Sequence, residues 1–364
     1  MSANAALGIF GHGIVSAVGH DGRSAFAAMR ARVRGFSEAN LWDSTSGRRL
    51  QASRPVLHQW WEGPTMWPEL AVPAVRQCLG QAESGVTGDV LISRDVPILS
   101  LLPPESRFGT PSGTLAGFSR ALAAKLGLPL SPGSATLRAG RTGMGHALQW
   151  VEGVIATHGA KAAVVVGVES FLRQSIVDYY IDVRRLLCAT NSNGFIPGEA
   201  ACAVLLAPVR KSSPPHLQIL GMAMKHESLD HVSGAGQATR AEALSTAWRS
   251  ALAGAGVPLH DIAYTVSDLN GERFKFKEAA IAAARNDRVP PEGRSRRAKG
   301  FLDLWHPSEF IGEVGAAISP CLLAWALEAG RQGYAPSPLT LMHASEDDGE
   351  RLAIVARFEA KGAS

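Results

Sequence analysis

Apolar residues in this chain fall into short continuous runs separated by longer amphipathic stretches. "LGIFGHGIVS" at 7–16 predicts a strand and a Gly-rich turn. "AAVVVGVES" at 162–170 is a continuous apolar run, which is typical of a strand covered on both faces. Between them, "PSGTLAGFSRALAAKLGL" at 111–128 has apolar residues at helical spacing. Strands that alternate with helices in this way predict a layered α/β fold.

The same alternation repeats after residue 210. "RKSSPPHLQ" at 210–218 concentrates Ser, Pro and charge, so we expect a linker there. We therefore expect two similar α/β halves, residues 1–209 and 215–364. The elements predicted after the linker are strands at 217–224, 337–345 and 351–360, a strand that ends in "YTVSDLNGE" at 264–272, and helices at 239–255, 276–285 and 315–332.

The pattern weakens between Leu41 and Trp67, where tryptophans stand among polar residues and prolines. We expect an irregular surface loop that packs on its own domain. An alternative is that Trp60 and Trp61 contact a protein partner, because a large rigid side chain with one polar end suits interfaces.

Composition and charge exclude several classes of protein. A chain of 364 residues with 46% hydrophobic content can bury a large core. The net charge of +4 is a weak basic bias, and we interpret "RSRRAK" at 294–299 as a solvated loop, not a nucleic-acid or lipid contact. No signal segment and no apolar run long enough to span a membrane is found, so we expect a cytoplasmic protein without membrane or nucleic-acid partners.

The four cysteines lack the spacing of a metal site or a disulfide framework. They are Cys78, Cys188, Cys202 and Cys321. A reducing cytoplasm fits this usage best. "GIFGHG" at 8–13 lacks the glycine spacing of a dinucleotide-binding turn, so no cofactor and no metal are expected.

Four segments in order resemble the β-ketoacyl synthases of the thiolase superfamily. They are "FGHGIVSAVGHD", "GAKAAVVVGVES", "NSNGFIPGEAACAVLLAP" and "FIGEVGAAISPCLLAWALEAGRQGYAP". The resemblance implies a five-layer αβαβα fold with two duplicated halves. It also implies a dimer assembled through the strand that precedes the nucleophile.

That family condenses acyl chains with a cysteine at a strand-to-helix turn and two histidines. On its motifs, "AGRTG" places Gly140 at the cysteine position, and glycine cannot attack a thioester. Asn270 in "LNGERFKF" replaces the first histidine and Glu313 in "FIGE" the second, while Ser308 replaces a lysine. The family's Gly-rich gating loop is absent from "HASEDDGER" at 343–351. We therefore expect no condensing activity.

Two alternatives would restore a nucleophile or a base. Cys188 or Cys321 is the candidate for a displaced nucleophile, although a cysteine in an apolar helix is more often a small core residue. His146 and His306 are candidate bases, which we interpret as packed or surface histidines.

The remaining polar residues near these motifs predict a hydrogen-bonded network at the position of the family's catalytic pocket. Arg141 and Thr142 follow Gly140, and Glu272 follows Asn270 by two residues. Glu272 and Glu313 form a carboxylate pair for acid or base work if they converge. We expect instead that Asn270 and Glu272 hydrogen-bond across an inert site and hold its loops.

Three functions remain open. The first is a catalytically inactive ketosynthase-like adaptor or chaperone, similar to the degenerate thiolase-like proteins encoded beside effectors in bacterial type VI secretion clusters. The second is an acyl-binding partner of an active ketosynthase, similar to chain-length factors, and the third is an enzyme with altered thioester chemistry. We expect a protein partner, and a homodimer or heterodimer. The remodelled motifs favour the first function, with the acidic turn "SEDDGE" at 345–350 as a recognition element.

Overall fold

The computed structural model describes residues 6–57, 61–83, 96–110, 115–129, 131–227, 240–288, 290–294 and 302–360. Within these ranges, five strands of the first half and five of the second belong to one mixed sheet. The first five are β1 (Leu7–Val15), β4 (Ile98–Leu102), β5 (Ala135–Arg138), β6 (Ala163–Ser170) and β7 (Glu199–Pro208). The second five are β8 (His216–His226), β9 (Tyr264–Ser267), β10 (Asp303–Trp305), β11 (Leu339–Ser345) and β12 (Glu350–Glu359).

The strand order repeats between the halves. The sheet reads β10-β9-β11-β12-β8-β1-β7-β6-β4-β5, so each half, numbered along its own chain, has the order 3-2-4-5-1. The halves meet where Gly8 and Ile9 of β1 pair antiparallel with Gln218 and Leu217 of β8. The predicted linker at 210–218 is therefore shorter than expected, because its last three residues belong to β8.

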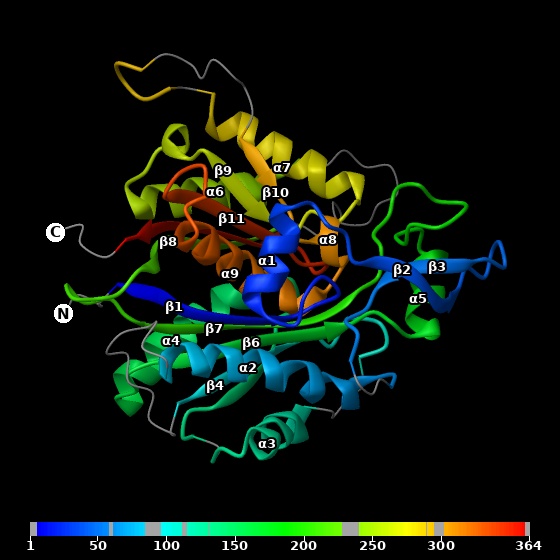
Figure 1. Cartoon of the computed structure of the whole chain (residues 1–364). Helices are drawn as coiled ribbons and strands as arrows, with labels where there is room; N and C mark the ends of the chain where they lie inside the picture. The colour runs from blue at the N-terminus through cyan, green and yellow to red at the C-terminus, as the bar shows by residue number, and fades with distance from the viewer. Residues whose placement is uncertain are drawn as a thin grey trace.

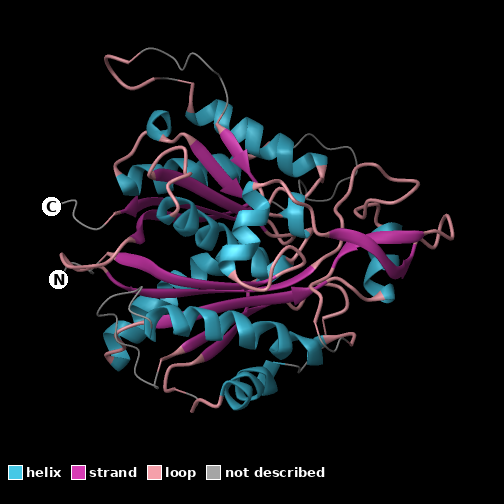
Figure 2. Ribbon diagram, viewed as in Figure 1, coloured by secondary structure: helices cyan, strands magenta, loops and turns pink. Residues whose placement is uncertain are grey.

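Helices cover both outer faces and fill the space between the half-sheets (Figure 1). α2 and α3 lie on the outer face of the first half-sheet, α6 and α7 on that of the second, and α4 and α9 between them. The predicted α/β class and its five layers are confirmed (Figure 2). The helices are α1 (Gly22–Arg30), α2 (Trp67–Glu83), α3 (Leu115–Leu126), α4 (Gly143–His158), α5 (Gln174–Asp182), α6 (Glu242–Ala255), α7 (Arg273–Asn286), α8 (Ser308–Ile311) and α9 (Ile318–Arg331), with 3-10 turns η1 (Pro64–Met66), η2 (Gly140–Thr142), η4 (Leu259–Asp261) and η5 (Gly315–Ala317).

The sequence of α9 explains its central place. Every residue from Ile318 to Ala329 is buried, because both half-sheets pack against this helix. A helix that is apolar all round needs such a sandwiched position. None of the described helices is both long and apolar enough to cross a membrane.

The expectation of an irregular loop between Leu41 and Trp67 is wrong for its first part. β2 (Phe36–Trp42) and β3 (Arg49–Ser53) pair as an antiparallel hairpin that projects from the body of the molecule (Figure 1). Its alternate residues pack on α5 and neighbouring aromatics; they are Ala39, Leu41, Leu50 and Ala52. These short strands mix charged and polar residues with few apolar ones, so the alternation is weak in the sequence.

Candidate functional site

The turn that carries the expected nucleophile position has no room for a side chain. Gly140 begins η2 with a φ of +52°, in the left-handed region. A Cβ atom built on Gly140 would lie 2.0 Å from Glu346 Oε2. The same oxygen accepts a 2.7 Å hydrogen bond from the Arg141 backbone N–H. The Glu346 carboxylate therefore occupies the space that a nucleophile would need.

The second half has the same arrangement at the corresponding turn. Gly315 begins η5 with a φ of +51°, and a Cβ atom there would lie 1.9 Å from Glu169 Oε2. That oxygen accepts a 2.8 Å hydrogen bond from the Ala316 backbone N–H. Glu169 lies in the fourth strand of the first half, and Glu346 follows the fourth strand of the second. Each half thus supplies a carboxylate to the turn before the other half's central helix, where negative charge is favourable.

Arg141 follows Gly140 and is fully buried. Its Nε lies 3.0 Å from Glu313 Oε1, and its Nη1 lies 2.9 Å from Glu346 Oε1 and 3.1 Å from Asp347 Oδ1. Burial alone would lower the pKa of Arg141, but these three carboxylates outweigh it and hold the pKa well above its ordinary value. The helix dipole disfavours a cation beside a helix N-terminus, and acidic side chains compensate for this at Arg141.

Two more arginines bind the same acidic residues. Arg107 contacts Glu169 at 3.1 Å, Glu346 at 2.9 Å and Asp347 at 3.0 Å. Arg185 contacts Glu272 at 2.6 Å and Asp347 at 3.0 Å. We call the whole set the buried charge network. It consists of Arg107, Arg141, Arg185, Asn270, Glu169, Glu272, Glu313, Glu346 and Asp347.

Asn270 joins the two acidic residues that the sequence placed near it. Its Nδ2 donates to Glu272 Oε2 at 3.1 Å and also to Glu313 Oε2. Its Oδ1 accepts from the Glu272 backbone N–H at 3.2 Å. The structure thus brings the residues at both histidine positions together with Glu272, and each carboxylate is also paired with an arginine.

Glu313 is poorly suited to accept a proton near neutral pH. Burial alone would raise the pKa of Glu313, but the charges of Arg141 and Lys275 outweigh it and lower the pKa to about 2. A carboxylate with so low a pKa is a weak base. Glu169 differs, because its burial outweighs the nearby arginines and raises its pKa to about 7.

Thr142 contacts a different carboxylate. Its hydroxyl donates to Glu350, which also lies 3.1 Å from His146 Nε2. The hydrogen bond with Glu350 outweighs burial and raises the pKa of His146.

Ser308 is buried at the start of α8, and its side chain makes no hydrogen bond to the network among the described residues.

The candidate displaced nucleophiles lie elsewhere. Cys321 is 1% exposed in the apolar core around α9. The Cys188 Sγ lies 3.5 Å from Thr190 Oγ1. His306 faces Glu309 at 3.8 Å, and burial lowers its pKa. Within the described residues, no thiol or imidazole hydrogen-bonds to the buried charge network, and no three His, Cys, Asp or Glu side chains are grouped to hold a metal ion.

Comparisons with solved structures identify the architecture. The chain aligns with the ishigamide ketosynthase/chain length factor over 97% of its length and 99% of that chain, with a TM-score of 0.68 and 18% identity. It aligns with a ketosynthase in complex with its chain length factor from Xenorhabdus doucetiae over 98% of both chains, with a TM-score of 0.71 and 14% identity. The chain has the ketosynthase fold.

A third match has the same fold in a longer chain. The ketosynthase from module 6 of the bacillaene synthase of Bacillus subtilis aligns over 97% of this chain and 72% of that one, with a TM-score of 0.73 and 12% identity. No family profile matches the sequence, and no curated protein is similar to it. The likeness at these identities shows the ketosynthase fold alone.

Sequence reasoning missed five members of the network, including Glu346 and Asp347. The acidic turn at 345–350 was expected to serve recognition, yet Glu346 is 3% exposed and points into the site. One signal was present for Glu169, which is an acidic residue at the end of a continuous apolar strand. Nothing local marks Arg107 or Arg185.

The raised pKa of Glu169 predicts a pH-dependent stability. A pKa raised from 4.5 to about 7 means that the folded state holds this proton more tightly, so its contribution is complete below pH 4.5 and lost as pH rises through 7. The shift corresponds to about 3 kcal/mol of unfolding free energy. Urea denaturation at successive pH values should show the loss, and Glu169→Gln, which stays neutral, should reduce it. An equal loss in both proteins would contradict the assignment.

Proposed function

We propose that this chain is a catalytically inactive ketosynthase-fold protein that acts by binding another protein, as an adaptor or chaperone. The observation that carries the proposal is the Glu346 carboxylate 2.0 Å from a Cβ atom built on Gly140. The absence of a nucleophile is therefore accompanied by a side chain that fills its place. The pair of Arg141 with Glu313 supports the same conclusion, because the arginine helps to lower the pKa of Glu313 to about 2 and so makes this carboxylate a weak base.

A bacterial type VI secretion effector is the partner that the sequence resemblance suggests, and we keep it as part of the proposal. The free state of all four cysteines agrees with a proposed cytoplasmic location. Trp60 and Trp61 remain a proposed contact for the partner. Trp61 is 37% exposed and its indole donates to Thr65 Oγ1 at 2.9 Å, whereas Trp60 lies outside the described residues.

An acyl-binding partner of an active ketosynthase is the second candidate. It is favoured by the solved complex of a ketosynthase with its chain length factor, which has the same fold. The buried charges argue against this candidate. An acyl chain needs apolar walls, whereas the charged side chains of Arg141 and Glu313 lie where the family's catalytic pocket would be. Either candidate is compatible with a dimer through β5, which lies at the edge of the sheet and pairs only with β4 among the described strands.

The proposal predicts no turnover of acyl thioesters. Purified protein, incubated with acyl and malonyl carrier-protein thioesters, should neither condense nor hydrolyse them above the rate without protein. Turnover that Cys321→Ala abolishes would overturn the proposal, since it would make that buried thiol a nucleophile. The variant Cys78→Ala, which removes another buried thiol, is the matched control.

The identity of the protein partner distinguishes the two candidate functions. Co-expression with the products of the flanking genes, followed by measurement of the mass of the purified complex, should yield a stoichiometric complex with a protein that is not a ketosynthase. A complex formed only with an active ketosynthase would favour the acyl-binding candidate instead.

A further inference from the structure

A groove lies between one face of α1 and the end of α9. Its volume is about 530 Å³, which is within the range of about 300 to 1,000 Å³ for small-ligand sites. Three residues of α1 and the residue that follows the helix line one wall of the groove. Their spacing places them on one face of the helix. They are Arg23, Ala27, Arg30 and Ala31, and Glu328 and Tyr334 line the opposite wall.

The rim of the groove carries two exposed arginines, Arg23 and Arg30. Neither has a described carboxylate within 4 Å, although the charge of Arg23 helps to lower the pKa of the exposed Asp21, which caps α1 through Ser24. The Arg30 guanidinium lies over the Tyr334 ring, 4.5 Å from its centre, which holds that charge at the rim. Glu328, at the base, is already bound, because its Oε2 lies 3.0 Å from His12 Nε2 and its Oε1 accepts from Gln332 at 3.0 Å.

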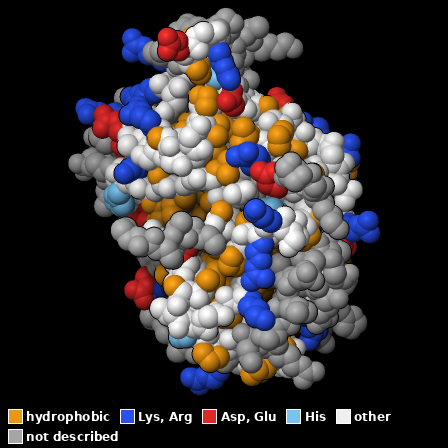
Figure 3. All heavy atoms as spheres, turned by 90° about the vertical axis from the view of Figure 1, so that its left-hand side faces the viewer, with side chains coloured by type: hydrophobic (Ala, Val, Ile, Leu, Met, Phe, Trp, Pro, Cys, Tyr) orange, Lys and Arg blue, Asp and Glu red, His pale blue; other side chains and the backbone are white. Residues whose placement is uncertain are grey.

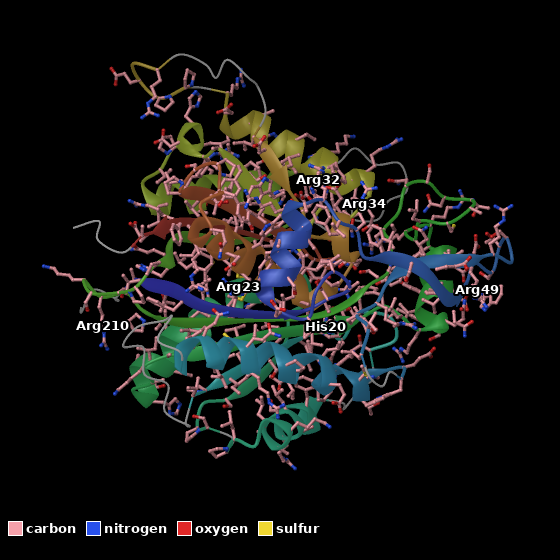
Figure 4. The ribbon with its side chains drawn as sticks, in the orientation of Figure 1. His20, Arg23, Arg32, Arg34, Arg49 and Arg210 are labelled. Carbon is pink, nitrogen blue, oxygen red and sulfur yellow. The ribbon has the colours of Figure 1, made fainter. Side chains whose placement is uncertain are left out.

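The surroundings strengthen this positive charge. Residues 21–34 contain four arginines and one acidic residue, Asp21. Arg32 and Arg34 share the single carboxylate of Glu309, at 3.2 and 3.1 Å. Figure 4 shows Arg23, Arg32 and Arg34 along and beside α1. By contrast, the left-hand face of the molecule carries acidic and basic side chains around an apolar centre (Figure 3).

We infer that the groove between α1 and α9 binds an acidic segment of a protein partner, with an apolar side chain on Ala27 and Ala31 and carboxylates on Arg23 and Arg30. This inference rests on the proposed protein-binding function. Arg23 and Arg30 are seven residues apart, which is about 10 Å along a helix. Carboxylates seven residues apart on a helix match that separation and lie on one helix face.

The lining favours a peptide over a nucleic acid. The two alanines leave space for a larger apolar side chain between the cationic ends, and such a floor offers nothing to a phosphate backbone. Charge complementarity at the rim and apolar contact at the floor together suit an amphipathic acidic segment.

The test uses the full chain and a fluorescein-labelled, helix-forming dodecapeptide with glutamates at positions 2 and 9, leucines at positions 5 and 6, and alanine or glutamine elsewhere, so that both carboxylates and both leucines share one helix face. Binding is followed by fluorescence anisotropy at low salt. The double variant Arg23→Glu with Arg30→Glu should bind at least about 10-fold more weakly. Ala27→Trp fills the groove without changing charge and should weaken binding as well. The matched control is Arg48→Glu with Arg210→Glu, which makes the same charge change at exposed positions outside the groove and should leave binding within about twofold.

Four outcomes would overturn the inference. Equal loss in the control pair would mean unspecific attraction, and unchanged binding by Ala27→Trp would place the peptide outside the groove. A single-stranded DNA dodecamer that binds where the peptide does not would assign the surface to nucleic acid. A co-purified partner that Arg23→Glu with Arg30→Glu still binds would contradict only this inference, whereas thioester turnover would contradict only the proposed function.

Discussion

Replacing Arg141 by alanine is expected to destabilise the protein by about 3 to 5 kcal/mol, the cost of leaving a buried charge uncompensated. Arg141 is fully buried and is the direct partner of Glu313 and Glu346. Urea denaturation at neutral pH measures the change. The control is Arg34→Ala, which removes an exposed partner of Glu309 and should cost less than about 1 kcal/mol.

Two further variants keep this prediction testable if Arg141→Ala does not fold. Arg141→Lys keeps the charge but cannot reproduce the planar guanidinium contacts, so it should cost less than alanine. Arg141→Met combined with Glu313→Gln should be more stable than Arg141→Met alone, because one uncompensated carboxylate is removed with the arginine. If Arg141→Ala costs less than about 1 kcal/mol, the network does not hold the core together.

Introducing the family's nucleophile by Gly140→Cys is expected to destabilise the protein by about 2 kcal/mol or more and to create no thioester turnover. A side chain at a φ of +52° costs about 1 to 2 kcal/mol. The new Cβ atom would also lie 2.0 Å from Glu346 Oε2, so the carboxylate must move away from Arg141. Thermal and urea denaturation measure the first effect, and the carrier-protein thioester assay the second.

The control for Gly140→Cys is Gly153→Cys on α4. A Cβ atom on Gly153 meets nothing within 4 Å, so this variant should be as stable as the parent. Gly140→Cys combined with Glu346→Gly removes the steric conflict, but Asn270 and Glu313 still supply no imidazole. A stable Gly140→Cys protein that gains condensing activity would mean that the pocket is open and chemically competent, which contradicts the proposed inactive function.

Long buried strands and periodic helices were predictable because each element carries its own pattern. "AVVVGVES" identifies β6, and the predominantly apolar "ISPCLLAWALEA" identifies the helix α9. The hairpin of β2 and β3 was missed because its burial depends on α5, which follows more than 120 residues later. A short strand of mixed polarity has no clear period until its partner is present.

The sequence by itself determined which side chains are available at the site: glycine at position 140, Asn270 and Glu313 carry no thiol or imidazole. Only the tertiary structure decided which side chains occupy the space of the missing thiol and imidazole groups. Glu346 reaches the Gly140 turn from 205 residues away, and Glu169 reaches Ala316 from 147 residues away. Local periodicity reports which face of one element is buried, whereas the pairing of buried charges depends on which distant elements the sheet brings together.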